Sequence, residues 1–199
     1  MDLVRIQLES IALEAEKSGW LYEESIRLRI GGVEHDIVPD RDSGTVLKFT
    51  KPGRAAYAVN FDLGTPMMVP ALPVEYLDRL MLQNRIFGDN LRFVGIAGAI
   101  GHRRIMTRQD ILKGKPAWWE EIVRMMTDLG FTKLRHNHGI GYEDSYAFLQ
   151  DDAVVFDLRP ANVFVTDDGT TAQFPCSGGF DCMRGGIPGK CAVPETIAV

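Results

Sequence analysis

The sequence is poor in cysteine and contains no long apolar run. Its three cysteines, Cys176, Cys182 and Cys191, are an odd number and form no C-x-x-C pair. This count and spacing favour free thiols in a reducing compartment over a disulfide framework or a metal knuckle. No window approaches the roughly 20 apolar residues that a membrane-spanning helix needs, and the opening MDLVRIQLES does not resemble a secretory signal. We therefore expect a cytoplasmic protein that does not act in a membrane.

Basic residues are also too few to dominate the charge. The chain has 22 Lys and Arg against 27 Asp and Glu, which gives a formal net charge of -5. This balance argues against nucleic acid as a partner bound through general electrostatics. The hydrophobic share of 45% in 199 residues is typical of a globular chain that buries a sizeable core.

The apolar pattern predicts an α+β protein. Helices are expected over residues 3–17, 73–87 and 115–131, and strands over 25–30, 34–39, 44–50, 55–61, 90–100 and 103–111. The third helix is expected to begin near Pro116 and to end at Gly130. Strands and turns follow it, and the Gly- and Pro-rich segment from residue 175 is expected to be mostly irregular. Strands and helices do not alternate as in βαβ units. The expected organisation is a β-rich half, 1–109, and a second half, 110–199.

A polar insert separates two apolar strand-like runs in VVFDLRPANVFV, residues 154–165. Asp157, Arg159 and Asn162 have the residue types and spacing of the D-L-x-x-x-N part of the protein-kinase catalytic loop. In such a loop the carboxylate accepts the proton of an attacking hydroxyl, and the amide five positions later reaches a metal ion. The guanidinium adds a cation where negative charge builds up. Ordinary turn chemistry is the alternative interpretation.

A second pattern lies upstream, in GTVLKFT and the helix that follows it. Lys48 stands where a kinase strand presents its phosphate-pairing lysine, and Glu75, or else Asp78, stands on the next helix as its candidate carboxylate partner. The alternative is a solvated strand lysine and a first-turn acid favoured by the helix dipole.

The order of these pieces resembles the compact kinase-like domain found in polyvalent proteins of phages and conjugative elements of bacteria. The pieces span most of the chain from Gly31 to Gly169. The resemblance implies a small two-lobed protein-kinase-like fold with a reduced C-terminal lobe that uses ATP and Mg²⁺, with a protein as substrate or partner. It implies Lys48, Glu75 and Gln109 as nucleotide-binding residues, Asp157 and Arg159 as catalytic residues, and Asn162 as a metal ligand.

The sequence departs from that family at three places. Val155 replaces the usual histidine, and GGVEHD offers only Gly31 and Gly32 to cover phosphates. Pro175 aligns with the magnesium-binding aspartate, and Asp181 replaces it only if the intervening residues loop back. Loss of a metal ligand costs several kcal/mol of transition-state stabilisation, so turnover is expected hundreds- to thousands-fold below an ordinary kinase. Two interpretations follow: an atypical phosphotransferase, or a non-catalytic pseudokinase-type module that acts through protein partners.

Overall fold

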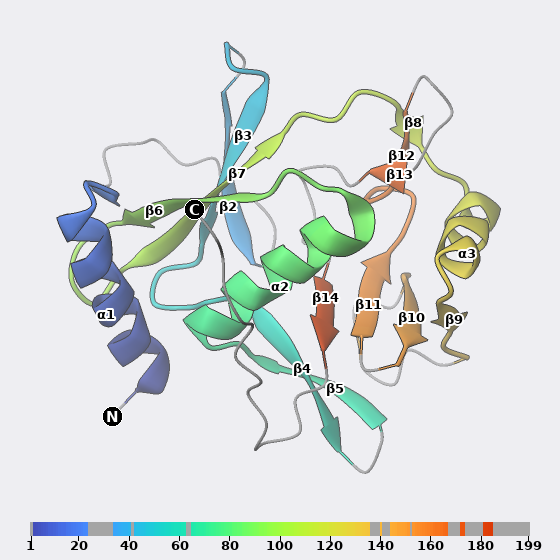
Figure 1. Ribbon diagram of the computed structural model, residues 1–199, viewed down its shortest axis with the longest axis horizontal. Coiled ribbons are helices and arrows are strands. Elements are labelled where there is room, and N and C mark those ends of the chain that lie inside the picture. Colours follow the sequence, from blue (N-terminus) through green and yellow to red (C-terminus); the bar gives the residue numbers. More distant parts are fainter. Residues whose placement is uncertain are drawn as a thin grey trace, which may run out of the picture.

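The computed structural model describes residues 2–23, 34–40, 42–62, 65–135, 140, 144–151, 153–166, 172–173 and 181–184. These residues form a mixed α+β fold with three helices and several small sheets (Figure 1). This confirms the predicted α+β class. No helix in the described ranges is long and apolar enough to cross a membrane.

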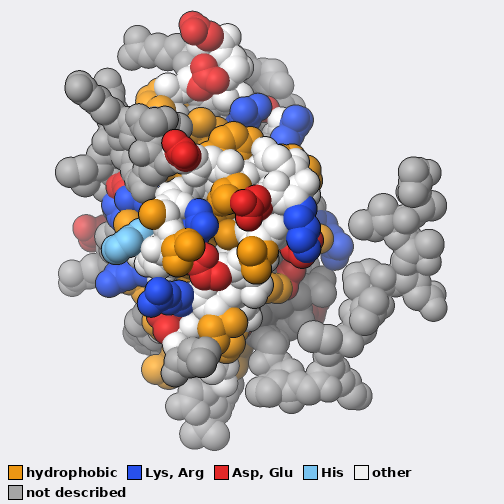
Figure 2. Space-filling view, turned by 90° about the vertical axis from the view of Figure 1, so that its left-hand side faces the viewer, with side chains coloured by type: hydrophobic (Ala, Val, Ile, Leu, Met, Phe, Trp, Pro, Cys, Tyr) orange, Lys and Arg blue, Asp and Glu red, His pale blue; other side chains and the backbone are white. Residues whose placement is uncertain are grey.

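Helix α1, Leu3–Lys17, has the bounds that the sequence predicts. The side chain of Asp2 caps its start by accepting a hydrogen bond from the Val4 amide at 3.1 Å. Its inner stripe of Leu8, Ala12 and Ala15 is buried in a hydrophobic cluster with α2 and the largest sheet. Its outer side carries exposed Leu3, Ile6 and Leu13. Figure 2 shows this side of the molecule, where apolar side chains lie among interspersed acidic and basic ones.

The largest sheet has five strands in the order β1-β6-β7-β3-β2. Its strands are β1 (Leu21–Tyr22), β2 (His35–Asp40), β3 (Thr45–Thr50), β6 (Arg92–Ala97) and β7 (Arg104–Asp110). β2–β3 and β6–β7 are antiparallel, as expected of hairpins, and β1 runs parallel to β6. A Cβ on Gly95 would lie 2.1 Å from the Trp20 carbonyl oxygen. Glycine is therefore required where β6 meets the chain leading into β1.

Helix α2, Pro73–Phe87, also has the predicted bounds, with proline at its start and Gly88 in the left-handed region (φ 68°) at its C-terminal cap. It joins two hydrophobic clusters. Tyr76 and Leu80 pack with α1 and the five-stranded sheet, whereas Phe87 packs with α3 and β11. Figure 1 shows α2 crossing the middle of the molecule. Helix α2 thus contacts both halves of the chain.

The second half contains helix α3 (Trp119–Asp128) and short strands. These strands are β8 (Lys115–Pro116), β9 (Thr132–Lys133), β10 (Tyr146–Gln150), β11 (Ala153–Leu158), β12 (Phe164–Val165), β13 (Ala172–Gln173) and β14 (Asp181–Arg184). They form a four-stranded sheet, β14-β11-β10-β9, and a three-stranded sheet, β13-β12-β8. The remaining hairpin, β4 (Tyr57–Asp62) with β5 (Thr65–Pro70), comes from the first half, but its Ala58 and Val59 pack with Val154 and Phe156 of β11. The hydrophobic clusters therefore cross the expected boundary between residues 109 and 110.

The structure differs from the expected pattern or adds to it at three places. The third helix begins at Trp119, not near Pro116, because residues 115–116 pair with β12 and the Ala117 amide bonds to the Val163 carbonyl at 2.8 Å. The segment after residue 175 contains a strand, β14. Strand β5, which begins and ends around prolines, was not predicted. The strand expected over 25–30 lies outside the described residues.

Candidate functional site

The loop between β11 and β12 brings Asp157 and Asn162 into direct contact. The Asn162 side-chain amide donates to the Asp157 carbonyl at 2.9 Å and to its carboxylate Oδ2 at 2.8 Å. Asp157 has a φ of 59°, in the left-handed region that Asp tolerates better than most residues. The backbone N–H of Asn162 donates to the Arg159 carbonyl at 2.8 Å and closes the turn between them. The two residues that share the D-L-x-x-x-N spacing therefore converge on one loop.

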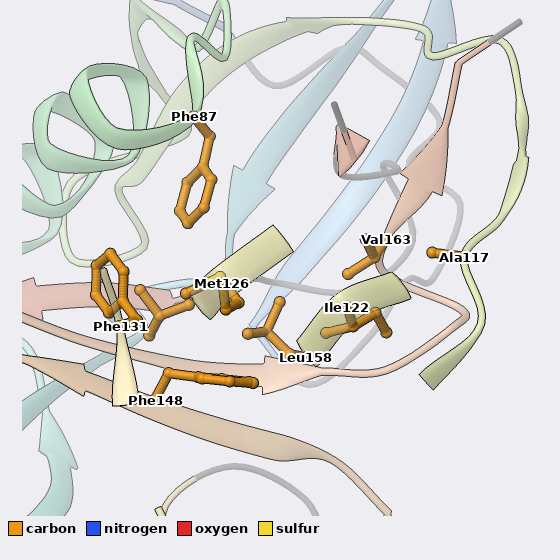
Figure 3. Close-up of a cluster of buried hydrophobic side chains, with 9 residues drawn as sticks. Phe87, Ala117, Ile122, Met126, Phe131, Phe148, Leu158 and Val163 are labelled. Atoms are coloured by element: carbon orange, nitrogen blue, oxygen red, sulfur yellow. The ribbon is translucent and has the colours of Figure 1, made fainter. Parts of the chain in front are cut away.

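Hydrophobic residues on either side fix this loop. Leu158 and Val163 are fully buried in the cluster formed with α3 and β10, and Figure 3 shows both among Ile122, Met126 and Phe148. A further contact comes from Gly114, where a Cβ would lie 2.3 Å from the Val165 carbonyl oxygen. The segment from β7 to β8 thus passes close against the strand that follows the loop.

Burial sets the electrostatics of Asp157, which is only 2% exposed. Burial raises the pKa of its carboxyl to about 6, against the opposing effects of the Arg159 guanidinium and the Asn162 hydrogen bond. Arg159 Nε lies 3.6 Å from Oδ1, which accepts no hydrogen bond from the described residues. The carboxylate of Glu34 also raises the pKa of Asp157. Glu34, a residue of the first half, therefore lies close enough to the loop for its charge to act on Asp157.

Glu34 belongs to a buried ion pair that joins the sheet to α2. Arg79 of α2 donates to it through both terminal nitrogens, with Nη2 3.1 Å from Oε2 and Nη1 3.4 Å from Oε1. Nη1 also donates to the Tyr57 carbonyl at 3.1 Å. Both side chains are almost fully buried. A buried pair of this kind leaves a costly uncompensated charge when one partner is removed.

One face of the five-stranded sheet, turned toward α2, carries His35, Lys48, Thr107 and Gln109; we call it the polar face. Lys48 pairs with Thr107 across the strands, and Ile105, two residues along β7, packs with Tyr76 and Leu80 of α2. His35 Nε2 lies 2.8 Å from the Tyr76 hydroxyl. Burial lowers the pKa of His35 to about 3, so the imidazole is neutral at pH 7. The buried Thr107 hydroxyl has no hydrogen-bond partner within the described ranges.

The predicted nucleotide-binding residues separate into two groups. Lys48 and Gln109 are buried on the polar face, 9% and 2% exposed. Glu75 lies exposed at the start of α2, where its carboxylate accepts a hydrogen bond from the Leu72 amide at 2.7 Å. Asp78 is also exposed. The structure therefore places Glu75 as a first-turn acid, which was its alternative interpretation, and adds a capping hydrogen bond to that position.

The chain after the loop returns to it. Strand β14 pairs antiparallel with β11, and the Cα of Asp181 lies opposite that of Phe156, the residue before Asp157. The looping back that a replacement for position 175 requires thus occurs in the backbone. Pro175, Gly31 and Gly32 lie outside the described residues. Within the described ranges, no group of three or more His, Cys, Asp or Glu side chains is placed to hold a metal ion.

The sequence reasoning missed the polar residues of α2. Arg79 and Gln83 lie on the same side of the helix as Tyr76, Leu80 and Phe87 and are buried with them. The signal available in the sequence was their spacing: Arg79 and Gln83 come three and seven residues after Tyr76, in the apolar stripe of the helix. Gln83 donates to Asp89 at 2.6 Å just beyond the helix.

No family model, curated protein or solved structure matches the chain.

Proposed function

We propose that the protein is an atypical kinase-like domain that transfers phosphate from ATP. The observation that carries this proposal is the loop geometry: a buried carboxylate, Asp157, held by the side-chain amide of Asn162 five residues later. The carboxylate and amide have the chemistry and the spacing that phosphoryl transfer uses to accept a hydroxyl proton and to hold a metal ion.

Asp157 has a basicity suited to accepting a proton near neutral pH. With a pKa of about 6, its carboxyl is mostly ionised at pH 7 but holds a proton more readily than an ordinary aspartate. In the proposed step the acceptor hydroxyl oxygen attacks the γ-phosphorus of ATP while Asp157 takes the hydroxyl proton. The bond between the γ-phosphorus and the bridging oxygen breaks, and ADP leaves with that electron pair. Arg159, close to Asp157, supplies a positive charge beside the transferring group.

The polar face supports a nucleotide site beside this loop. Lys48 supplies a buried cation for phosphate groups, and Thr107 has a buried hydroxyl available for a polar ligand. Gln109 lies at the end of β7, where the chain leaves the five-stranded sheet for β8. This segment is the proposed hinge for the adenine base.

The donor set fits a magnesium ion delivered with ATP. The side-chain nitrogen of Asn162 makes both donations to Asp157, so its side-chain oxygen would be the atom that serves as ligand. Mg²⁺ in such sites takes one or two protein ligands together with phosphate oxygens and water. When bound, the ion neutralises phosphate charge during transfer.

A non-catalytic binding module is the second candidate. The exposure of only 2% for Asp157 favours it, since an acceptor hydroxyl must reach this carboxylate. Pro175 at the aligned metal position also favours it. In this case the buried charges stabilise a surface for a protein partner.

A thermal-shift experiment tests nucleotide binding directly. We expect ATP with Mg²⁺ to raise the melting temperature of the wild type, because a ligand that binds the native state stabilises it by mass action. Lys48→Met should remove most of this shift, and the exposed Glu16→Gln on α1 serves as a matched control. No shift with ATP, with or without Mg²⁺, would reject the nucleotide site. A shift without phosphate transfer would favour the binding module.

A further inference from the structure

We infer that Trp118 anchors a docking surface for an acidic segment of a partner protein, beside the loop that carries Asp157. The surface is formed by residues 113–118, which lead from β7 into α3; we call them the docking segment. Docking itself does not depend on chemistry at the loop. Its use in presenting an acceptor hydroxyl to Asp157 rests on the proposed phosphotransferase function.

The side chain of Trp118 is 69% exposed, although the helix that begins beside it is buried along one side. The neighbouring Trp119 packs against the hydrophobic cluster of the second half, and its ring centroid lies 4.4 Å from that of Tyr146. The core therefore uses only one of the two adjacent tryptophans. A large exposed aromatic side chain is typical of the residues that carry binding energy in protein interfaces.

The side chain of Trp118 does not stabilise helix α3 either. Trp118 is the N-cap of α3, a position that favours Ser, Thr, Asp or Asn because their side chains accept a hydrogen bond from the first turn. Its own side chain makes no capping bond. Instead, the Glu121 carboxylate accepts a hydrogen bond from the backbone N–H of Trp118 at 2.7 Å. Neither core packing nor helix capping explains a tryptophan here, and such a break with local preference indicates a functional position.

The docking segment is fixed beside the proposed catalytic loop. Its strand β8 is an edge strand of the sheet β13-β12-β8 and pairs with β12, which follows the loop. The backbone N–H of Ala117 donates to the Val163 carbonyl, and Figure 3 shows these two residues on adjacent segments. Val163 directly follows Asn162. A partner segment held at Trp118 therefore lies next to the loop that would receive its hydroxyl.

The charges of the docking segment fit an acidic partner. Lys113 and Lys115 are exposed, and neither makes an ion pair within the described residues. Arg159, on the loop, adds a cation whose side chain is 35% exposed. Against these three cations, Glu120 in the first turn of α3 is the exposed acid that follows the segment. In a chain with a formal net charge of -5, this local excess of positive charge favours an acidic partner segment by complementarity.

The test uses a fluorescein-labelled random copolymer of Glu and Tyr, whose side chains are acidic, aromatic and hydroxyl-bearing. Its binding is measured by fluorescence anisotropy without ATP. We expect the wild type to bind it more tightly than polyglutamate, which lacks the aromatic ring, and than a copolymer of Lys and Tyr, which reverses the charge. Trp118→Ala should weaken binding at least about tenfold, whereas Trp20→Ala, at another exposed tryptophan, should not change it. Lys115→Glu should also weaken binding, with the exposed Lys17→Glu on α1 as its control.

Equal affinity of the wild type and Trp118→Ala for the Glu–Tyr copolymer would overturn the inference, as would no binding of this copolymer by the wild type. Tighter binding of the Lys–Tyr copolymer or of single-stranded DNA would overturn it as well, because the partner would then have a different chemistry. The proposed function is decided separately, by phosphate transfer from ATP. A wild type that binds the Glu–Tyr copolymer through Trp118 but transfers no phosphate retains the docking surface and rejects the phosphotransferase.

Discussion

The Asn162 side chain donates hydrogen bonds to both the backbone carbonyl and the carboxylate of Asp157, at 2.9 and 2.8 Å. Both residues are buried, so water does not reach the two groups and cannot replace their hydrogen bonds. The pair thereby fixes the six-residue loop from within. It also fixes the direction of the one carboxylate that we propose as the proton acceptor.

Asn162→Ala should therefore be strongly destabilising. The substitution removes two hydrogen bonds and leaves the carboxylate of Asp157 buried with fewer partners, a loss of about 2–4 kcal/mol in the free energy of unfolding. Urea denaturation of the variant beside the wild type measures it. A loss no larger than that of Ala161→Gly, at the neighbouring exposed position, would show that the contact does not hold the loop.

The backbone of Asp157 predicts which substitutions the site tolerates. At φ 59°, asparagine is accommodated, whereas a β-branched residue is strained. At pH 4, where the carboxyl is protonated, we expect Asp157→Asn to fold with stability close to that of the wild type, and Asp157→Val to lose about 2 kcal/mol or more. Equal stability of the two variants would contradict the observed backbone conformation.

The raised pKa of Asp157 predicts a pH dependence with a definite sign. The carboxyl titrates at about 6 in the folded protein, above its ordinary 3.8, so the folded state binds this proton more tightly. Its contribution is fully present below about pH 4 and is lost as the pH rises through 6. The wild type should therefore lose stability relative to Asp157→Asn between pH 4 and 7, by on the order of 2 kcal/mol.

Chemical denaturation of both proteins across that range gives the difference in their free energies of unfolding. The titrations of His35 and Asp89 cancel in this difference, because both proteins contain these residues. A wild type that gains stability relative to the variant with rising pH would mean that the folded-state pKa is lowered. The burial argument for Asp157 would then be wrong.

The buried Glu34–Arg79 pair predicts a non-additive double variant. Arg79→Met leaves the Glu34 carboxylate uncompensated and should cost about 3–5 kcal/mol of unfolding free energy. Adding Glu34→Gln removes that charge and should restore part of the loss. Calorimetry of the two single variants and the double variant checks this. Additive losses would indicate that the two side chains do not depend on each other.

The sequence predicted the elements whose signals are local. Helices α1 and α2 have the predicted bounds because each has an apolar stripe and defined ends, Asp2 and Gly19 for the first, Pro73 and Gly88 for the second. The convergence of Asp157 and Asn162 also followed from a short spacing between two strands. Where only distant pairing decides, the prediction was wrong: Pro116 pairs with Phe164 of β12, and α3 therefore begins three residues later.

The surroundings of Lys48 were not predictable by the same means. Glu75 lies in the first turn of α2, where it accepts the local capping bond from the Leu72 amide. No periodicity tells which end of the helix approaches the lysine, because that depends on how α2 is placed against the sheet. That placement follows from the packing of Tyr76, Leu80 and Phe87 in two separate clusters.

Transfer of the γ-phosphate from labelled ATP is the most direct test of the proposed function. The wild type and Asp157→Asn are incubated with ATP and Mg²⁺, and labelled phosphate is measured both in solution and on the protein. We expect slow transfer by the wild type, well below the rate of about 1 per second of an ordinary kinase, and its loss in Asp157→Asn. Equal signals from the two proteins would contradict Asp157 as the proton acceptor and would reject the phosphotransferase.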